Sequence, residues 1–283
     1  MSILVFGASS QIGHFLLPRL HRLGAAVYAI SRRPRAPREG ARWLQGQLPD
    51  VVPDLSTTPA AIVSFGPIGP FAAWLATARF ATPPRVIATS SMSAHTKRDS
   101  TVAAERALAQ QLRDGEHAIA NACAHLGAPW TIFRPTLVYG AGLDQSLTPI
   151  ARRALRTHVF PLPAGRGLRQ PVHADDIALA VIAALRQPAS AGHILAIGGG
   201  ERLLAADMFR RVRDSLPTRT LPVPLPAGLL HAAQHLAPTR LRGPLHRLDC
   251  DLVADNTELT RLLGVVPRPF VVDADMWLAP REG

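Results

Sequence analysis

The sequence contains few of the residues on which several classes of protein depend. It has two cysteines, Cys123 and Cys250, among 283 residues. So low a number argues against a disulfide framework or a cysteine-rich zinc site, and it indicates a reducing compartment. No apolar run approaches the roughly 20 residues that span a bilayer, and the first residues lack the features of a signal peptide. We therefore expect a cytoplasmic protein without a membrane partner.

Lysine and tyrosine are almost as rare. Lys97 is the one lysine, and Tyr28 and Tyr139 are the two tyrosines. Arg32 and Leu143 stand four positions after these tyrosines, so the chain has no Tyr-x-x-x-Lys pair. Such a pair places an ammonium beside a phenol, lowers the phenol pKa and makes tyrosine a proton donor near neutral pH. The sequence therefore excludes proton transfer by a Tyr-x-x-x-Lys pair.

Positive charge is abundant even though lysine is not. The 31 Lys and Arg residues face 20 Asp and Glu residues, which gives a formal net charge of +11. A basic chain of this kind can bind nucleic acid, but the sequence has no dense basic run with interleaved aromatic residues. We interpret the excess of arginine as a compositional bias and expect no nucleic-acid partner.

Short apolar runs alternate with longer amphipathic segments over the first 200 residues. The predicted strands cover residues 3–6, 26–30, 61–65, 86–89, 130–133 and 193–199. The predicted helices cover residues 11–23, 70–78, 102–125 and 175–185, the last capped by Asp175 or Asp176. Strands that are apolar on both faces and alternate with helices predict an α/β fold, a doubly wound parallel sheet of the Rossmann type.

The length allows one large domain with a smaller lobe. We expect a nucleotide-binding Rossmann domain over residues 1–200, with residues 140–170 contributing to a substrate cleft. Proline becomes frequent and helical segments dominate beyond residue 200. Residues 201–283 are therefore predicted to form a smaller, mostly helical, substrate-binding lobe.

A glycine loop joins the first predicted strand to the first predicted helix. Gly7 permits a tight turn, the small Ser10 allows close approach of a pyrophosphate, and Gly13 allows the helix to pack near the strand. Phosphates would then lie at the positive helix N-terminus. The position of this loop favours dinucleotide binding over an ordinary strand-to-helix turn.

The end of the second predicted strand indicates which dinucleotide binds. NAD sites place a carboxylate there to accept the ribose hydroxyls, whereas this strand ends in Ser31, Arg32 and Arg33, with no acid before Glu39. A guanidinium pairs with a 2′-phosphate and can stack on adenine. The sequence therefore predicts NADP(H), with Arg32 as the first contact and Arg33 in support. The alternative is a solvated basic turn.

Four segments together resemble the extended and atypical short-chain dehydrogenase/reductases of the NAD-dependent epimerase/dehydratase-like family. They are "GASSQIG", "RVIATSSMSA", "WTIFRPTLVYG" and "RQPVHADDIALAV", in that order over about the first two hundred residues. The resemblance implies that Ser91 polarises the substrate, that Thr89 and Ser90 lie near the nicotinamide ribose, and that Pro135 and Leu137 border the nicotinamide amide.

The same resemblance places Phe65 and Gly66 along the adenosine ribose and Gln47 near adenine. The full set of predicted cofactor-binding residues is Gly7, Ser9, Ser10, Gln11, Ile12, Gly13, Ser31, Arg32, Arg33, Gln47, Phe65, Gly66, Thr89, Ser90, Pro135 and Leu137. No metal site is predicted.

The proton donor of the family has no counterpart here. The positions of the family's tyrosine and lysine fall near Leu112 and Glu116, counted back from Arg134. Lys97, which follows Ser91, is the first substitute, with His95 and Glu116 as alternatives. Each has an ordinary interpretation as well: an exposed loop lysine, an unremarkable loop histidine and a solvated helix charge.

A glycine-flanked basic segment, "AGRGLRQPVH", resembles a place where epimerase-like relatives hold a substrate phosphate. Arg166 and Arg169 are candidates for bidentate contact there, and a solvated surface hairpin is the alternative. The favoured function is an NADP(H)-dependent oxidoreductase or epimerase-like enzyme acting on a small metabolite. A non-catalytic NADP(H) redox sensor is the alternative.

Overall fold

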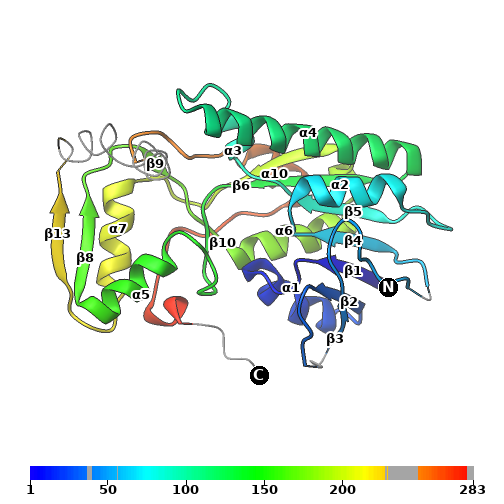
Figure 1. The fold of residues 1–283 in the computed structure, drawn as a ribbon, viewed down its shortest axis with the longest axis horizontal. Coiled ribbons are helices and arrows are strands. Elements are labelled where there is room, and N and C mark those ends of the chain that lie inside the picture. Colours follow the sequence, from blue (N-terminus) through cyan, green and yellow to red (C-terminus); the bar gives the residue numbers. More distant parts are fainter. Residues whose placement is uncertain (37–39, 56, 227, 229–247, 279–283) are drawn as a thin grey trace.

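The computed structural model describes residues 1–36, 40–55, 57–226, 228 and 248–278. Its centre is a seven-stranded sheet in the order β11-β6-β5-β4-β1-β2-β3, in which all neighbours are parallel (Figure 1). The strands are β1 (Ser2–Phe6), β2 (Ala26–Ser31), β3 (Ala41–Gln45), β4 (Ala61–Ser64), β5 (Arg85–Thr89), β6 (Trp130–Pro135) and β11 (His193–Ile197). The predicted doubly wound sheet is confirmed.

The strand β3 was not among the predicted strands. It is an edge strand, and none of its five residues is fully buried, because only β2 pairs with it. Its sequence, "ARWLQ", therefore lacks the continuous apolar run that identified the interior strands.

Helices cover both faces of the sheet (Figure 1). One apolar core lies under α1 (Gln11–Arg22), α6 (Ala174–Arg186) and α10 (Thr257–Leu263). The other lies under α2 (Ile68–Thr77) and α4 (Ala103–Leu126). The four predicted helices are present with ends shifted by up to two residues, which is the usual uncertainty of helix ends.

The start of α6 differs from the prediction. His173 is the N-cap, and its Nδ1 accepts a hydrogen bond from Asp175 N at 3.1 Å. Asp175 and Asp176 lie in the first helical turn and bind arginines instead of capping the helix. The prediction of an aspartate cap was wrong because an imidazole acceptor already occupies the capping position.

Asp175 and Asp176 link three segments that are far apart in the sequence. Arg19 of α1 donates two hydrogen bonds of 2.7 Å to Asp175. Arg268, beyond α10, donates to Asp176 at 2.8 Å and to Asp175 at 2.9 Å. The network holds α1, α6 and the segment around residue 268 in one arrangement.

The smaller lobe packs around a separate core that includes Tyr139, Phe160, Phe270 and Trp277. Its elements are β7 (Val138–Tyr139), α5 (Thr148–Thr157), β8 (Val159–Pro163), β9 (Leu168–Arg169), β10 (Val172–His173), β12 (Leu203–Leu204), α7 (Ala205–Asp214), β13 (Leu221–Leu225) and η2 (Ala274–Trp277). Two further short helices belong to the larger domain, α3 (Ser93–Thr96) and η1 (Pro188–Ser190). Parts of the predicted lobe, at residues 227, 229–247 and 279–283, lie outside the described residues.

The strand order reverses beside β1, which pairs with β2 on one side and with β4 on the other. Connections leave such a strand toward opposite sides, and a crevice opens at its carboxyl end. Within the described ranges, no helix is long and apolar enough to cross a membrane. Those residues also form no group of three or more His, Cys, Asp or Glu side chains suited to a metal ion.

Candidate functional site

The predicted glycine loop lies at this crevice, between β1 and α1. Gly7 has a φ of +66°, a conformation that glycine adopts without steric cost. Ser10 N donates to Gly7 O at 2.9 Å, and Ser10 Oγ accepts from Gly13 N at 3.2 Å. Ser10 is therefore both the small residue of the loop and the N-cap of α1.

Close packing explains both glycines. A Cβ atom on Gly13 would overlap the backbone carbonyl of Ala8. A Cβ atom on Gly7 would lie 3.0 Å from the carbonyl carbon of Phe65 in the segment after β4. The loop is thus pressed against its own helix and the neighbouring strand end, and its backbone faces the crevice.

A cavity of about 540 Å³ opens beside this loop. Eight of the predicted cofactor-binding residues line it: Gly7, Ser9, Ser10, Ser31, Arg32, Gln47, Phe65 and Gly66. Leu48, Pro67 and Pro70 complete an apolar wall that the sequence reasoning did not identify. The prolines of "FGPIGP" were the available signal, because they follow β4 at the same sheet edge.

The far end of this cavity is basic. Ser31 and Arg32 line it, and none of its described lining residues is acidic. Arg33 is exposed and is not a lining residue, although its N–H donates to Ser31 Oγ at 3.3 Å. The structure therefore brings Arg32, and not Arg33, to the cavity.

Polar side chains gather at the carboxyl end of β5. Thr89 Oγ1 donates to Ser64 O at 3.4 Å, and Ser91 Oγ accepts from Ser93 N at 3.1 Å. The Oγ atom of Ser90 is buried and has no hydrogen-bond partner among the described residues.

The segment after β5 runs beside the end of β6. Met92 N donates to Pro135 O at 2.9 Å, and Leu137 O accepts from Val172 N at 2.8 Å. Pro135 therefore lies beside the serine segment, while Leu137 pairs with Val172 at the start of β10.

The single lysine is held in an ion pair. Lys97 Nζ lies 3.6 Å from Glu105 Oε1, and the two side chains are 12% and 9% exposed. Ser100 Oγ also donates to Glu105, at 2.8 Å. Lys97 is therefore a largely buried, ion-paired residue rather than an exposed loop lysine. His95, the second candidate, is exposed.

The third candidate, Glu116, and the other residues relevant to the missing Tyr-x-x-x-Lys pair are held by contacts within the protein. Glu116 is fully buried and binds the guanidinium of Arg134 with both carboxylate oxygens, one of them at 2.8 Å. Leu112 is partly buried and packs against the core beneath α2 and α4. The Tyr139 hydroxyl donates to Val271 O at 3.3 Å, and burial raises its pKa to about 12. Glu116 is thus held in an ion pair and the Tyr139 hydroxyl in a hydrogen bond, while Leu112 has no titratable group.

Arg166 and Arg169 contact the segment around residue 250. Arg169 is buried, and its Nη1 donates to Leu168 O at 2.8 Å and to Cys250 O at 2.6 Å. A Cβ atom on Gly167 would lie 2.5 Å from Cys250 O, so this glycine accommodates the segment around residue 250. Arg166 is exposed, and its N–H donates to Asp249 at 3.3 Å.

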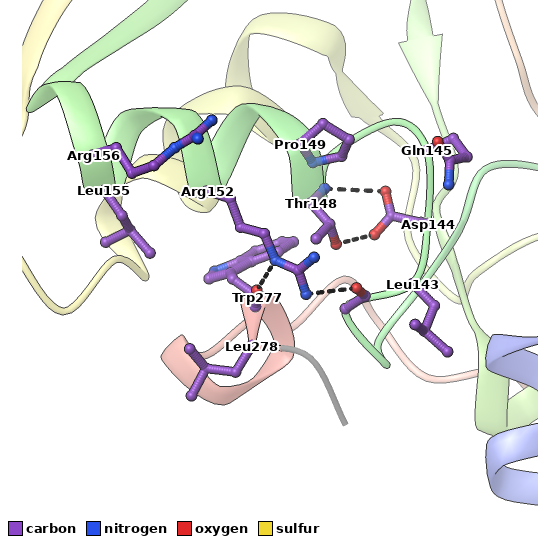
Figure 2. A pocket seen from close by; sticks show the side chains of 11 residues that line it. Leu143, Asp144, Gln145, Thr148, Pro149, Arg152, Leu155, Arg156, Trp277 and Leu278 are labelled. Carbon is purple, nitrogen blue, oxygen red and sulfur yellow. Dashed lines mark hydrogen bonds between the residues drawn. The ribbon is translucent and has the colours of Figure 1, made fainter. Parts of the chain in front are cut away.

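A second cavity, of about 760 Å³, lies between α5 and η2 (Figure 2). Two of its polar side chains, Asp144 and Arg152, are bound within the protein. Asp144 accepts hydrogen bonds from Thr148 at the start of α5, and Arg152 donates at 2.8 Å to the carbonyl oxygens of Trp277 and Gly142. These contacts anchor η2 to the lobe, so the candidate site is the crevice at the glycine loop.

Comparison with known proteins agrees with this geometry. Residues 75–198 match the model of the NAD dependent epimerase/dehydratase family, which confirms the resemblance seen in the sequence. No curated protein matches the chain in a sequence search.

Solved structures match almost the whole chain. A UDP-glucuronic acid 4-epimerase from Bacillus cereus, in complex with NAD, is 17% identical with a TM-score of 0.72, covering 99% of this chain and 97% of that one. The hexosamine dehydratase TunA, of tunicamycin biosynthesis, is 18% identical with a TM-score of 0.69, covering 97% and 94%. A UDP-glucose 4-epimerase from Thermotoga maritima is 15% identical with a TM-score of 0.70, covering 98% and 96%. At these identities the similarity shows a shared fold.

Proposed function

We propose that this chain binds NADP(H) and is an oxidoreductase or epimerase-like enzyme acting on a small metabolite. The observation that carries the proposal is the cavity of about 540 Å³ at the carboxyl ends of the central parallel strands. The glycine loop lies on one side of this cavity and Arg32 on another. This is where open α/β sheets bind dinucleotides.

The residues present fit a dinucleotide. The first turn of α1 has N–H groups without helical partners, which suit a pyrophosphate, and Gly7 and Gly13 keep the approach clear of side chains. Ser90 Oγ and Gln11 Oε1 are buried polar atoms without a partner among the described residues. Buried polar atoms of this kind are rare in native proteins unless a bound molecule satisfies them.

The preference for NADP(H) rests on Arg32. The Bacillus cereus UDP-glucuronic acid 4-epimerase holds NAD. In this chain an arginine lies at the end of β2, and the described lining of the cavity has no carboxylate that would repel a 2′-phosphate. A guanidinium supplies a charge-assisted hydrogen bond to such a phosphate.

The reacting end of the site is proposed to lie at Ser91. Bound NADPH supplies a hydride, and the chain must stabilise the charge that develops on the substrate oxygen. The Ser91 hydroxyl can donate a hydrogen bond to that oxygen, because its hydrogen bond with Ser93 N uses it only as an acceptor. Lys97 is the first candidate for supplying the proton, and Arg166 and Arg169 remain candidates for substrate contact.

One observation favours the second function, an NADP(H)-binding redox sensor without turnover. The positions where the family's tyrosine and lysine are expected hold Leu112, which packs against the core, and Glu116, which is in an ion pair. The charge of Lys97 is likewise matched by Glu105. Tight cofactor binding together with no turnover on a broad set of carbonyl and activated-alkene substrates would favour the sensor.

Fluorescence titration with NADPH and NADH tests the cofactor assignment. We expect NADPH to bind at least about tenfold more tightly, since a charge-assisted phosphate contact contributes about 1.5–3 kcal/mol. Arg32→Ala should weaken NADPH binding to the level of NADH. Arg42→Ala, an exposed arginine on β3, is the matched control and should leave both affinities unchanged. Equal wild-type affinities for the two cofactors would overturn the assignment.

A further inference from the structure

The side chain of Gln11 joins the glycine loop to the smaller lobe. Gln11 is the first residue of α1, and its Nε2 donates to Val138 O of β7 at 3.2 Å. A carbonyl oxygen can only accept a hydrogen bond, so this contact determines which end of the amide carries the nitrogen. The Oε1 atom is therefore an acceptor whose position is set by two separate elements.

This acceptor has no donor in the protein. Gln11 Oε1 is buried and has no hydrogen-bond partner among the described residues. Native proteins rarely leave such an atom unpaired, because burial removes its water and nothing replaces it. The orphaned oxygen at the start of α1 points to a donor on a molecule that binds in the crevice.

The chemistry of the dinucleotide narrows the choice of donor. NADP(H) carries N–H donors at the adenine amino group and at the nicotinamide carboxamide. The adenosine half fits the cavity lined by Arg32 and Gln47, and Gln11 is not a lining residue of that cavity. Gln11 instead contacts Val138, the residue after Leu137, on the lobe side of the crevice.

We propose that Gln11 Oε1 accepts a hydrogen bond from the carboxamide N–H of bound nicotinamide. This inference rests on the proposed function and adds a specificity-determining residue to it. The two faces of the nicotinamide ring exchange by a half-turn about the bond to the ribose, and that turn carries the carboxamide to the opposite side. An acceptor fixed by α1 and β7 therefore selects which ring face meets the substrate.

A cofactor analogue tests this contact in the unmodified protein. In the 3-acetylpyridine analogue of NADP⁺, a methyl group replaces the amino group of the carboxamide, so the analogue has a similar shape without the N–H donor. The loss of one hydrogen bond to a buried acceptor predicts binding about tenfold weaker than that of NADP⁺. Equal affinities of the wild-type protein for NADP⁺ and the analogue would overturn the inference. This test does not depend on the folding of any variant.

Two glutamine variants then locate the contact. Gln11→Met keeps the length of the side chain and removes the acceptor, so NADP⁺ and the analogue should bind with the same affinity. Gln47→Met is the matched control at the adenosine end, and it should weaken both ligands equally while the ratio of their affinities stays at the wild-type value. A folded Gln11→Met protein that still prefers NADP⁺ about tenfold would overturn the inference.

Adenosine 2′,5′-bisphosphate separates this inference from the proposed function. It carries the adenosine half of NADP(H) and no nicotinamide, so Gln11→Met should bind it as the wild-type protein does. If the bisphosphate binds but the wild-type protein does not distinguish NADP⁺ from its analogue, the role of Gln11 fails alone. If neither the bisphosphate nor NADP⁺ binds, the proposed function fails and the inference fails with it.

Discussion

Glu116 of α4 binds Arg134 of β6 through both oxygens of a carboxylate that has no solvent exposure. The Arg134 side chain is 23% exposed, so the pair is nearly sealed between the helix and the sheet. Planar guanidinium and carboxylate groups match in a bidentate contact of this kind. The pair fixes α4 on the sheet.

Breaking this pair should destabilise the fold. Glu116→Gln leaves the Arg134 guanidinium largely buried without its counter-charge, and we expect the free energy of unfolding to fall by about 3 kcal/mol. Urea denaturation followed by circular dichroism measures this change. Glu258→Gln removes one partner of the exposed Glu258–Arg261 pair and should change stability little. A similar small effect at Glu116 would show that the buried pair contributes nothing.

Gly13→Val should abolish cofactor binding. A side chain at this position would overlap the Ala8 carbonyl, push α1 away from the loop and displace the helix N-terminus from the phosphates. Titration with NADPH and a circular dichroism spectrum should be recorded on the same preparation. Gly24→Val is the matched control for bulk, because nothing lies within 4 Å of a Cβ atom there, although its φ of +70° adds local strain. Undiminished NADPH binding by folded Gly13→Val would mean that this loop is not the site.

Stability should fall in mild acid because of His173. Burial, followed by the charge of Arg268, lowers the pKa of His173 below its ordinary value of 6.5. The folded protein then binds fewer protons at this site than the unfolded chain does. The stabilisation is complete above pH 6.5 and is lost as the pH falls through the folded-state pKa, by at most about 1.4 kcal/mol per pH unit.

The measurement compares His173→Asn with the wild-type protein. Asparagine is a good N-cap without a titrating group, so its unfolding free energy should vary less between pH 7 and pH 5. Urea denaturation at a series of pH values gives both curves. His125→Asn, at an exposed helix end, is the control and should keep the wild-type dependence. Parallel curves for His173→Asn and the wild-type protein would contradict the assignment.

Turnover, where a substrate is found, should depend on Ser91. Loss of one hydrogen-bond donor to a developing oxyanion typically costs about 10²–10³ in rate, so Ser91→Ala should lower kcat by that factor with NADPH affinity retained. Ser93→Ala is the matched control, because it removes a neighbouring hydroxyl but keeps the backbone N–H that donates to Ser91 Oγ. The assay follows NADPH oxidation against carbonyl and activated-alkene substrates. Activity unaffected by Ser91→Ala would exclude the proposed site.

Lys97→Met tests the proposed proton donor in any reaction that the protein is found to catalyse. If Lys97 supplies the proton, the rate should fall by about 10²-fold or more, the typical contribution of a general acid. Because Lys97 pairs with Glu105, the variant also removes this ion pair. Lys97→Arg keeps the charge and is the control for this loss. An unchanged rate in Lys97→Met would leave histidine, glutamate or water as the proton source.

The sequence by itself determined the fold class and the glycine loop. Interior parallel strands are buried on both faces, so β1, β2, β4 and β5 appear as short apolar runs that local inspection detects. The loop is equally local, because the turn, the cap and the close helix packing are all made within seven residues. The absence of a Tyr-x-x-x-Lys pair is likewise a property of the sequence alone.

Only the tertiary structure decided what the charged side chains do. Lys97, Glu116, Arg169 and the aspartates of α6 find partners that are 8 to 93 positions away in the chain. No local pattern encodes such distances, so an exposed lysine, a solvated glutamate, a free arginine and an aspartate cap were all reasonable expectations from sequence. Burial settled each of them, because a charge removed from water must be paired or hydrogen-bonded, and the fold alone determines which partner lies within reach.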